Sequence, residues 1–323
     1  MRAAFYRLLD AAAPLGPRGD AGVLRAAFDA LDLRRHGGLA LVDIGAAGAL
    51  PPRFAPVVDS LAYTGFEPDD RSRSALLDAD PGCLSYTIRP EAIGTGEPIT
   101  LHLLEEAVFS SPFPPDRERL GRYPHPERFA TSATVEMPTA PLDALGLEAC
   151  HFIKVDIQGG ELAALKGADT LLEGCFGVES EVEFTALYHG QPLFADMQEH
   201  LTSRGFEFVD FVTLGRWSRD RDDRLGQCLY GDALFLRPPE RVLAAGPTPG
   251  EFAAYLGVLS AYRRYDWIRT TLATLPGDDP LHGDFARATS RGARRQARLA
   301  AIPRAALRAA GGDQPGYRAH LFY

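Results

Sequence analysis

Three acidic residues stand where they could contact a ligand: Asp43, Glu67 and Asp156 each follow a short apolar stretch. The stretches have the length and the apolar, β-branched content of buried strands. Ligands of parallel sheets bind beyond the carboxyl ends of the strands, and these ends share one edge of the sheet. We therefore expect the three carboxylates to line one site that suits a cationic ligand.

A loop of small residues follows the first acid: Gly45, Ala46, Ala47 and Gly48. Glycine lets a ligand approach the backbone, and a short helix that begins with two prolines at 51–52 would offer free N–H groups beyond the loop. Glu67, which Pro68 follows, is placed to accept hydrogen bonds from a ribose diol. The unit predicts a nucleoside-type cofactor, although its glycines could simply turn the chain of an ordinary βαβ unit.

Two cofactor classes use this geometry, dinucleotides and S-adenosylmethionine. A dinucleotide site wants G-x-G-x-x-G because the pyrophosphate sits on the turn, whereas this loop has only Gly45 and Gly48. The carboxylate of Asp43 is a poor neighbour for a pyrophosphate and a suitable one for an ammonium and a sulfonium. These features favour S-adenosylmethionine.

Strand-like and helix-like segments alternate from 39 to 213, and a last strand follows at 229–236. This alternation predicts an α/β fold with a doubly wound, mostly parallel, Rossmann-like sheet. We expect its strands at 39–44, 61–66, 83–88, 99–103, 133–137, 151–156, 176–184 and 206–212, and a helix at 161–172. The proline-rich stretch 105–130 is expected to be a lid or a surface excursion, and helices are expected at 1–13, 20–35 and 251–263.

Composition and charge narrow the class of protein. The chain has 323 residues, an apolar fraction of 46% and a formal net charge of −9, which indicates a globular protein and argues against a general nucleic-acid binder. No apolar run approaches the roughly 20 residues that span a membrane, and the N-terminus does not resemble a signal peptide, so we expect a cytoplasmic protein. The four cysteines lack zinc spacing, and no metal site is expected.

An arginine-rich segment lies near the C-terminus. It holds seven arginines and no acid between 287 and 308. A solvated helix face is the ordinary interpretation, and an acidic acceptor, a membrane surface or the acidic rim of a partner subunit are the alternatives.

The segment 152–168, FIKVDIQGGELAALKGA, resembles the FkbM family of S-adenosylmethionine-dependent methyltransferases, whose pattern is roughly K-x-D-x-E/Q-G-x-E-x-x-x-L-x-G-A. Further segments resemble family motifs in the same order, namely VDIGA at 42–46, GFEP at 65–68, PLD at 141–143, EVE at 181–183, LYHGQP at 187–192 and GDALF at 231–235. The resemblance covers about 39–237. It departs from the family at Ala47, where asparagine is common, and at Ala49, where a small glycine is common.

The resemblance implies a class I methyltransferase domain at 37–237, with helical extensions at 1–36 and 238–323. Asp156 is expected to contact the cofactor and, together with His189, to serve catalysis. Ile93 could pack on the adenine or belong to the core. The acceptor contacts that we expect are Ser111, Glu181 and Tyr188. A carboxylate group of Asp156, Glu181 and Glu183 that binds a metal is a weaker alternative.

The reaction that we predict is O-methylation of a hydroxyl on a sugar, glycan or secondary metabolite. An alcohol acceptor needs a base to take its proton. Two other classes stay open, a nicotinamide-dependent (NAD) oxidoreductase on the same kind of sheet and a non-catalytic binding module. The helical ends could cover a sheet edge or serve a second subunit in a homodimer.

Overall fold

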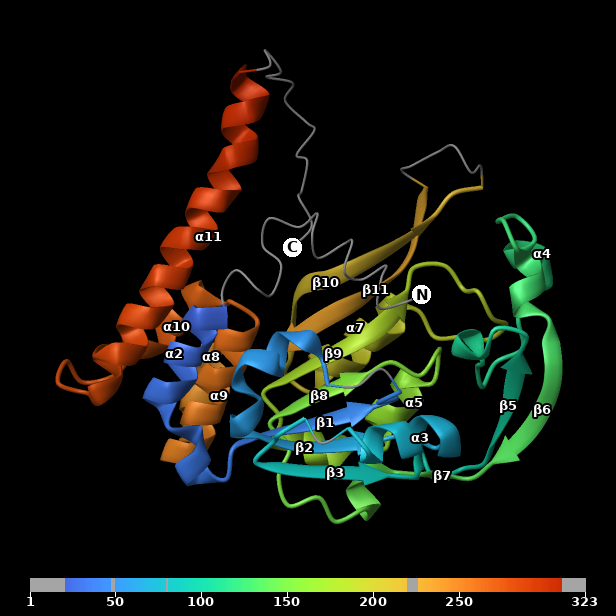
Figure 1. The fold of residues 1–323 in the computed structure, drawn as a ribbon, viewed down its shortest axis with the longest axis horizontal. Coiled ribbons are helices and arrows are strands. Elements are labelled where there is room, and N and C mark those ends of the chain that lie inside the picture. The colour runs from blue at the N-terminus through green and yellow to red at the C-terminus, as the bar shows by residue number, and fades with distance from the viewer. Residues whose placement is uncertain (1–20, 48–49, 80, 220–225, 310–323) are drawn as a thin grey trace.

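The computed structural model describes residues 21–47, 50–79, 81–219 and 226–309. The helix expected at 1–13, the loop residue Gly48 and the departure at Ala49 lie outside these ranges. Figure 1 shows a central sheet with a bundle of helices at one end and a small β-hairpin region at the other.

A seven-stranded sheet forms the centre of the molecule, with the order β3-β2-β1-β8-β9-β11-β10 (Figure 1). Its strands are β1 (Leu39–Ile44), β2 (Leu61–Phe66), β3 (Ser85–Arg89), β8 (Phe152–Val155), β9 (Gly177–Glu183), β10 (Glu207–Trp217) and β11 (Gln227–Leu236). The five strands from β3 to β9 run parallel, and β11 pairs antiparallel with both β9 and β10. The doubly wound, mostly parallel fold class expected from the sequence is confirmed.

Strand β1 is buried along its whole length and is apolar except for Asp43, as expected where both faces of a sheet are covered. Its side chains alternate, so that Leu41 and Asp43 face one side while Val42 and Ile44 face the other. Leu41 belongs to the larger hydrophobic core, and Val42 and Ile44 belong to a second core on the opposite face.

The second core is covered by α5 (Glu161–Lys166), α6 (Asp169–Glu173) and α7 (Phe194–Ser203). The single helix expected at 161–172 is wrong, because the chain breaks at Gly167. A Cβ on Gly167 would stand 2.1 Å from the carbonyl oxygen of Gly94, so the β4–β7 region packs directly on the helix end. Asp143 then caps the new helix by accepting hydrogen bonds from the N–H groups of Thr170 and Leu171.

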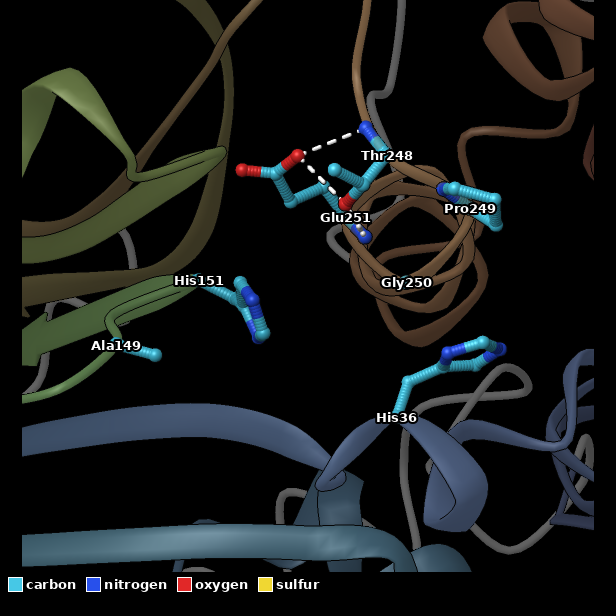
Figure 2. Close-up of a pocket in the computed structure, with 7 residues that line it drawn as sticks. All are labelled: His36, Ala149, His151, Thr248, Pro249, Gly250 and Glu251. Carbon is cyan, nitrogen blue, oxygen red and sulfur yellow. Dashed lines mark hydrogen bonds between the residues drawn. The ribbon is translucent and has the colours of Figure 1, made fainter.

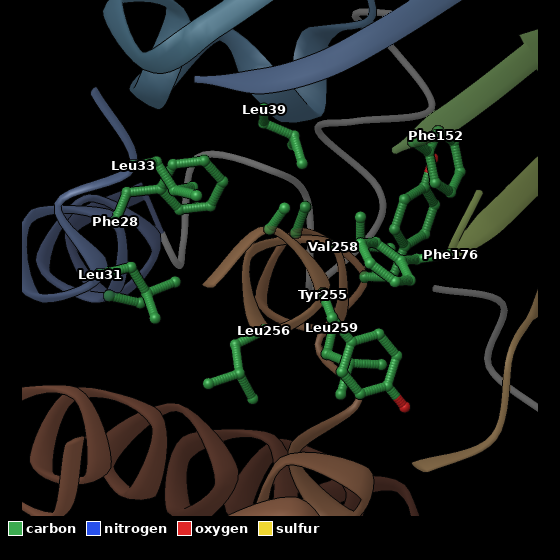
Figure 3. Close-up of a cluster of buried hydrophobic side chains, with 14 of the residues drawn as sticks. Phe28, Leu31, Leu33, Leu39, Phe152, Phe176, Tyr255, Leu256, Val258 and Leu259 are labelled. Carbon is green, nitrogen blue, oxygen red and sulfur yellow. The ribbon is translucent and has the colours of Figure 1, made fainter. Parts of the chain in front are cut away.

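The larger core joins the sheet to helices from both ends of the described chain (Figure 3). These elements are α2 (Ala21–Leu31), η2 (Leu33–His36), η3 (Pro52–Ser60), α8 (Pro239–Ala244), α9 (Pro249–Ala261), α10 (Tyr265–Leu272), η7 (Pro280–His282) and α11 (Asp284–Ala309). The helix expected at 251–263 is α9, and the short helix expected at the prolines 51–52 is the 3-10 helix η3.

Helix α9 lies at the middle of this core. Every residue from Ala253 to Ala261 is buried, as befits a helix with apolar residues all around its axis. Its start is fixed by a capping box in which Thr248 and Glu251 exchange hydrogen bonds. The C-terminal helices therefore share a core with the sheet, while the domain boundaries at 37 and 237 stay predictions.

Helix α11 continues beyond the body of the protein as a long arm (Figure 1). It packs along α2 near its start, and the side chains of Arg287, Arg291 and Arg294 are exposed. In the part of the chain that the structure describes, neither α11 nor another helix is long and apolar enough to cross a membrane.

Residues 92–140 build a separate lobe beside α3 (Asp70–Leu77) and β3. The strand expected at 99–103 pairs with β6 outside the central sheet, as β5 (Ile99–Leu104) and β6 (Thr131–Met137) form a hairpin of their own. The other elements of this lobe are β4 (Ala92–Ile93), η4 (Ala107–Phe109), α4 (Arg117–Leu120), η5 (Pro126–Phe129) and β7 (Thr139–Ala140). The short helix η6 (Leu142–Ala144) follows the lobe. The stretch 105–130 is thus folded around an aromatic cluster that includes Phe109, Tyr123, Phe129 and Trp217.

Candidate active site at the carboxyl ends of the central strands

The loop after β1 lies directly against the end of β8. Gly45 has φ +83°, and a Cβ there would stand 2.2 Å from the carbonyl oxygen of Asp156. The N–H groups of Gly45 and Ala46 both donate to the carbonyl of Phe66, at 3.0 and 3.1 Å. Glycine is therefore required at position 45 by the neighbouring strand, a reason that the sequence alone did not reveal.

Glu67 directly follows β2, beside the same loop, and is 6% exposed. Its Oε1 accepts a hydrogen bond of 2.8 Å from the N–H of Asp69. Burial raises the pKa of Glu67, and hydrogen bonds from the backbone of Asp69 and Ala47 oppose that rise. The structure thus brings Glu67 and its neighbour Pro68 together with the small-residue loop.

Asp43 is almost fully buried in β1, at 1% exposure. Its Oδ2 accepts a hydrogen bond of 2.9 Å from the hydroxyl of Tyr63 on β2. Its Oδ1 has no hydrogen-bond partner among the described residues and lies 3.8 Å from Nζ of Lys154. Burial raises the pKa of Asp43, and the charge of Lys154 lowers it. A carboxylate oxygen without a donor is suited to a cationic or N–H-bearing ligand.

Lys154 stands among acids on one face of the sheet. Its Nζ lies 3.8 Å from Oδ2 of Asp156, in addition to Asp43, and the register pairs it with Glu179 on β9. On β11, burial raises the pKa of Asp232 to about 6. Lys154 was not predicted as a site residue, because only the strand order shows which acids surround it.

Glu161 holds the loop that follows Asp156. Its two carboxylate oxygens accept hydrogen bonds from the N–H groups of Ile157 and Gly159, at 2.7 and 2.9 Å. The side chain is 3% exposed, and burial raises its pKa to about 7. Glu161 therefore shapes the loop on which the position of Asp156 depends.

Gln158 links this loop to the acceptor side of the site. It has φ +58°, and its Nε2 donates to Oε2 of Glu181 at 2.6 Å and to Oδ1 of Asp156 at 3.4 Å. The carbonyl of Gln158 accepts a hydrogen bond of 2.7 Å from the hydroxyl of Ser111. Asp156, Glu181 and Ser111 are thus connected through one residue that sequence reasoning missed.

A profile of the methyltransferase FkbM domain matches residues 51–208. The chain carries an FkbM methyltransferase domain. The family resemblance predicted from the segment 152–168 is confirmed, and the family's cofactor is S-adenosylmethionine. The expected range of 39–237 is wider than the match, which leaves 39–50 and 209–237 outside. No curated protein matches the sequence.

Several solved structures are similar to this chain. The FkbM methyltransferase of Methylobacillus flagellatus is 17% identical with a TM-score of 0.36, over 62% of this chain and 43% of that protein. This chain thus spans less than half the length of that relative. Magnesium protoporphyrin IX methyltransferase of Synechocystis, solved with bound S-adenosylmethionine, is 12% identical with a TM-score of 0.33, over 68% and 83%. A TehB-like methyltransferase of Corynebacterium glutamicum is 12% identical with a TM-score of 0.31, over 64% and 86%.

Two expected acceptor residues of the FkbM domain are buried in its framework. Ser111 is 0% exposed, and its hydroxyl also accepts a hydrogen bond of 3.1 Å from the N–H of Phe113. Tyr188 is 2% exposed and donates its hydroxyl to the carbonyl of Phe109 at 2.7 Å. These contacts favour supporting roles, and direct contact with an acceptor stays a prediction.

His189 lies next to Tyr188 on the exposed rim of the FkbM domain. Its backbone N–H donates to the carbonyl of Pro114 at 2.8 Å, which ties this loop to the 92–140 lobe. No described residue makes a hydrogen bond or ion pair with its imidazole. The ring is therefore accessible, and its catalytic role stays a prediction.

The remaining expectations concern the adenine and a metal. Ile93 is 7% exposed and packs in the second core, so its contacts are those of a core residue. Among the described residues, no group of three or more His, Cys, Asp or Glu side chains is arranged to hold a metal ion.

A cavity of about 400 Å³ lies at the opposite, amino ends of the strands (Figure 2). It is lined by His36, which precedes β1, by His151, which precedes β8, and by the start of α9. The Nδ1 of His151 accepts a hydrogen bond from the N–H of Ala40 at 2.9 Å, and Glu251 is engaged by Thr248. This cavity is separate from the edge that holds Asp43, Glu67 and Asp156.

Proposed function

We propose that this chain is an S-adenosylmethionine-dependent O-methyltransferase that acts on a hydroxyl of a small-molecule or glycan acceptor. The observation that supports it most is the meeting of Asp43, Glu67 and Asp156 at one edge of the sheet, within or beside an FkbM domain. When it is bound, S-adenosylmethionine supplies a methyl group on a positively charged sulfur.

The residues at this edge fit that cofactor. The unpartnered Oδ1 of Asp43 offers a buried acceptor to a cation, and Glu67 offers a carboxylate oxygen to a ribose. We propose that Gly45, Ala46, Ala47 and Pro68 form the wall around them, together with Gly48, which lies outside the described residues. We propose that Ile93 packs against the adenine while it remains part of the core.

Asp156 is the proposed base. Its side chain is 36% exposed, so an acceptor can reach it from solvent, whereas the side chain of Asp43 beside it is 2% exposed. Hydrogen bonding from Gln158 and the charge of Lys154 hold the carboxylate in place. A well-oriented base and acceptor can lower a barrier by on the order of 7–11 kcal/mol through positioning.

The acceptor side of the proposed site is formed by Glu181 and the rim residue His189. Glu181 already accepts from Gln158 and retains further acceptor capacity for a hydroxyl. His189 has the exposure that a second proton acceptor needs, and a histidine has a suitable intrinsic pKa. Ser111 and Tyr188 are proposed to hold the loops that carry these groups.

We also propose that the protein works in the cytoplasm. All four cysteines are free thiols, Cys150 and Cys175 are buried, and disulfides are rare in reducing compartments. The net charge of −9 gives no support for a nucleic-acid partner. A homodimer stays a prediction.

A labelled-methyl screen tests the proposed reaction. Purified protein is incubated with S-adenosylmethionine carrying a labelled methyl group and with pools of hydroxylated acceptors, including sugars and polyketide-like alcohols. We expect wild type to transfer the labelled methyl group to an oxygen of an acceptor, and we expect Asp156→Asn not to do so. Transfer to nitrogen or carbon by wild type would overturn the assignment to oxygen.

A further inference from the structure

Lys154 bridges the two carboxylates on which the proposed function depends. Strands β1 and β8 are neighbours, and their register places Lys154 beside Asp43. The Nζ lies 3.8 Å from Oδ1 of Asp43 and 3.8 Å from Oδ2 of Asp156. One ammonium group therefore stands between the buried acid of β1 and the partly exposed acid that follows β8.

The surroundings of Lys154 keep it charged. Its side chain is 21% exposed, and burial alone would lower the pKa of the ammonium. The carboxylates of Asp43, Asp156, Glu179 and Asp232 outweigh burial and raise that pKa. A second cation, Arg53, lies 3.4 Å from Glu179 and stacks over the ring of Tyr262.

Lys154 is one of two groups that favour the charged form of Asp43. The groups that face it are Tyr63 on β2, Lys154 on β8, Asp156 at the end of β8 and Glu179 on β9. Burial raises the pKa of Asp43, and Asp156 and Glu179 raise it further. Only the charge of Lys154 and the hydrogen bond from Tyr63 lower it.

We propose that Lys154 is a positioning residue of the methyl-transfer site, which holds Asp43 as a carboxylate toward the cationic end of the cofactor and fixes Asp156 beside it. This inference rests on the proposed function. It predicts that cofactor affinity depends on pH through Asp43 once Lys154 is gone, because a protonated Asp43 offers no charge to an ammonium or a sulfonium.

Lys154→Met and Lys154→Arg separate charge from shape. Methionine keeps an unbranched side chain and removes the charge, while arginine keeps the charge. In Lys154→Met we expect S-adenosylmethionine to bind at least about tenfold more weakly at pH 6 than wild type does, with partial recovery by pH 8.5 as Asp43 ionises. Lys154→Arg is expected to follow the pH profile of wild type.

Isothermal titration calorimetry of S-adenosylmethionine between pH 6 and 8.5 measures these profiles without an acceptor. The double variant Asp43→Asn with Lys154→Met is expected to bind weakly at every pH, with no recovery. If wild type and Lys154→Met show the same dependence of affinity on pH, the inference about Lys154 is overturned while the proposed function stands. The same holds if Lys154→Arg loses as much affinity as Lys154→Met. If wild type binds no S-adenosylmethionine at any pH, the proposed function falls and this inference falls with it. Should Lys154→Met fail to fold, Lys154→Gln takes its place, with the same expected profile and the same contradicting result.

Discussion

The hydroxyl of Tyr262 donates a hydrogen bond of 2.7 Å to Oε2 of Glu179. Tyr262 caps the end of α9 in the C-terminal helices, while Glu179 lies in the middle of β9. The Tyr262 ring also stacks on Phe152 with a centroid distance of 4.9 Å, and the guanidinium of Arg53 lies 4.2 Å above it. The helices outside the matched FkbM domain therefore complete the polar face of the sheet.

Replacing Tyr262 by phenylalanine tests this link. The change leaves Glu179 buried with Arg53 as its remaining close partner, and a hydrogen bond to a charged group contributes about 1.5–3 kcal/mol. We expect the free energy of unfolding in urea to fall by that amount. Tyr255→Phe is the matched control, since its hydroxyl donates to the carbonyl of Arg237, and a loss of only about 0.5–1.5 kcal/mol is expected there. Equal losses in the two variants would contradict a special role for Tyr262.

Gly45→Ala should disrupt the contact between the cofactor loop and β8. Position 45 has φ +83°, and the new methyl would clash with the carbonyl of Asp156. We expect both the melting temperature and the affinity for S-adenosylmethionine to fall. Gly82→Ala is the control, because it has φ +80° and its Cβ meets no atom within 4 Å. A Gly45→Ala protein that binds the cofactor as tightly as Gly82→Ala would rule out this packing.

Glu161→Gln should change how stability depends on pH. The folded-state pKa of Glu161 is raised to about 7, so between about 4.5 and 7 the folded protein binds this proton more tightly than the unfolded chain. The carboxyl contributes most to stability below that window, and its contribution is lost as the pH rises through 7. Glutamine is uncharged at every pH, but its amide nitrogen cannot accept the second of the two hydrogen bonds that Ile157 and Gly159 donate to Glu161.

Urea unfolding at pH 5 and pH 8 measures this effect. Wild type is expected to be more stable than Glu161→Gln at pH 5, because the variant loses one of the two hydrogen bonds, and this difference should shrink by about 1–3 kcal/mol at pH 8. Glu161→Ala serves as the control, because it removes the acceptors of both loop N–H groups and should be less stable at either pH. If the stability of wild type relative to Glu161→Gln increases as the pH rises, the pKa of the Glu161 carboxyl is lowered and not raised.

Asp156→Asn and His189→Ala should separate catalysis from binding. Asp156 is partly exposed, and the imidazole of His189 is exposed, so neither change empties the core. We expect the rate of methyl transfer to fall about 10²–10⁴-fold for the variant that lacks the base, with cofactor affinity changed much less. Single-turnover assays with the acceptor found in the screen provide the measurement. If neither variant slows transfer, both catalytic assignments are wrong.

The sequence predicted the central sheet well because its strands are short apolar runs between turn residues. It placed Asp43, Glu67 and Asp156 at one edge for the same reason. The sequence could not show that β5 lies outside the central sheet, because the periodicity of a strand does not indicate which strand it pairs with. The break at Gly167 depends on a contact with Gly94, which is distant in the chain.

The acids and cations around Lys154 were also beyond sequence reasoning. Lys154 and Glu179 meet only because β8 and β9 pair in one register, and a shift by one residue would turn them to opposite faces. Tyr262 reaches Glu179 from a helix that lies outside the resembling segment. The chemistry of single strands could therefore be predicted, while the network between strands required the structure.

Calorimetric titration of the purified protein with S-adenosylmethionine and, separately, with NAD tests the central claim most directly. Binding of S-adenosylmethionine alone is predicted, with a large loss of affinity in Glu67→Ala. Little change is expected in the control Asp78→Ala, an exposed acid at the end of α3. Binding of NAD alone, or equal affinity of wild type and Glu67→Ala for S-adenosylmethionine, would contradict the account.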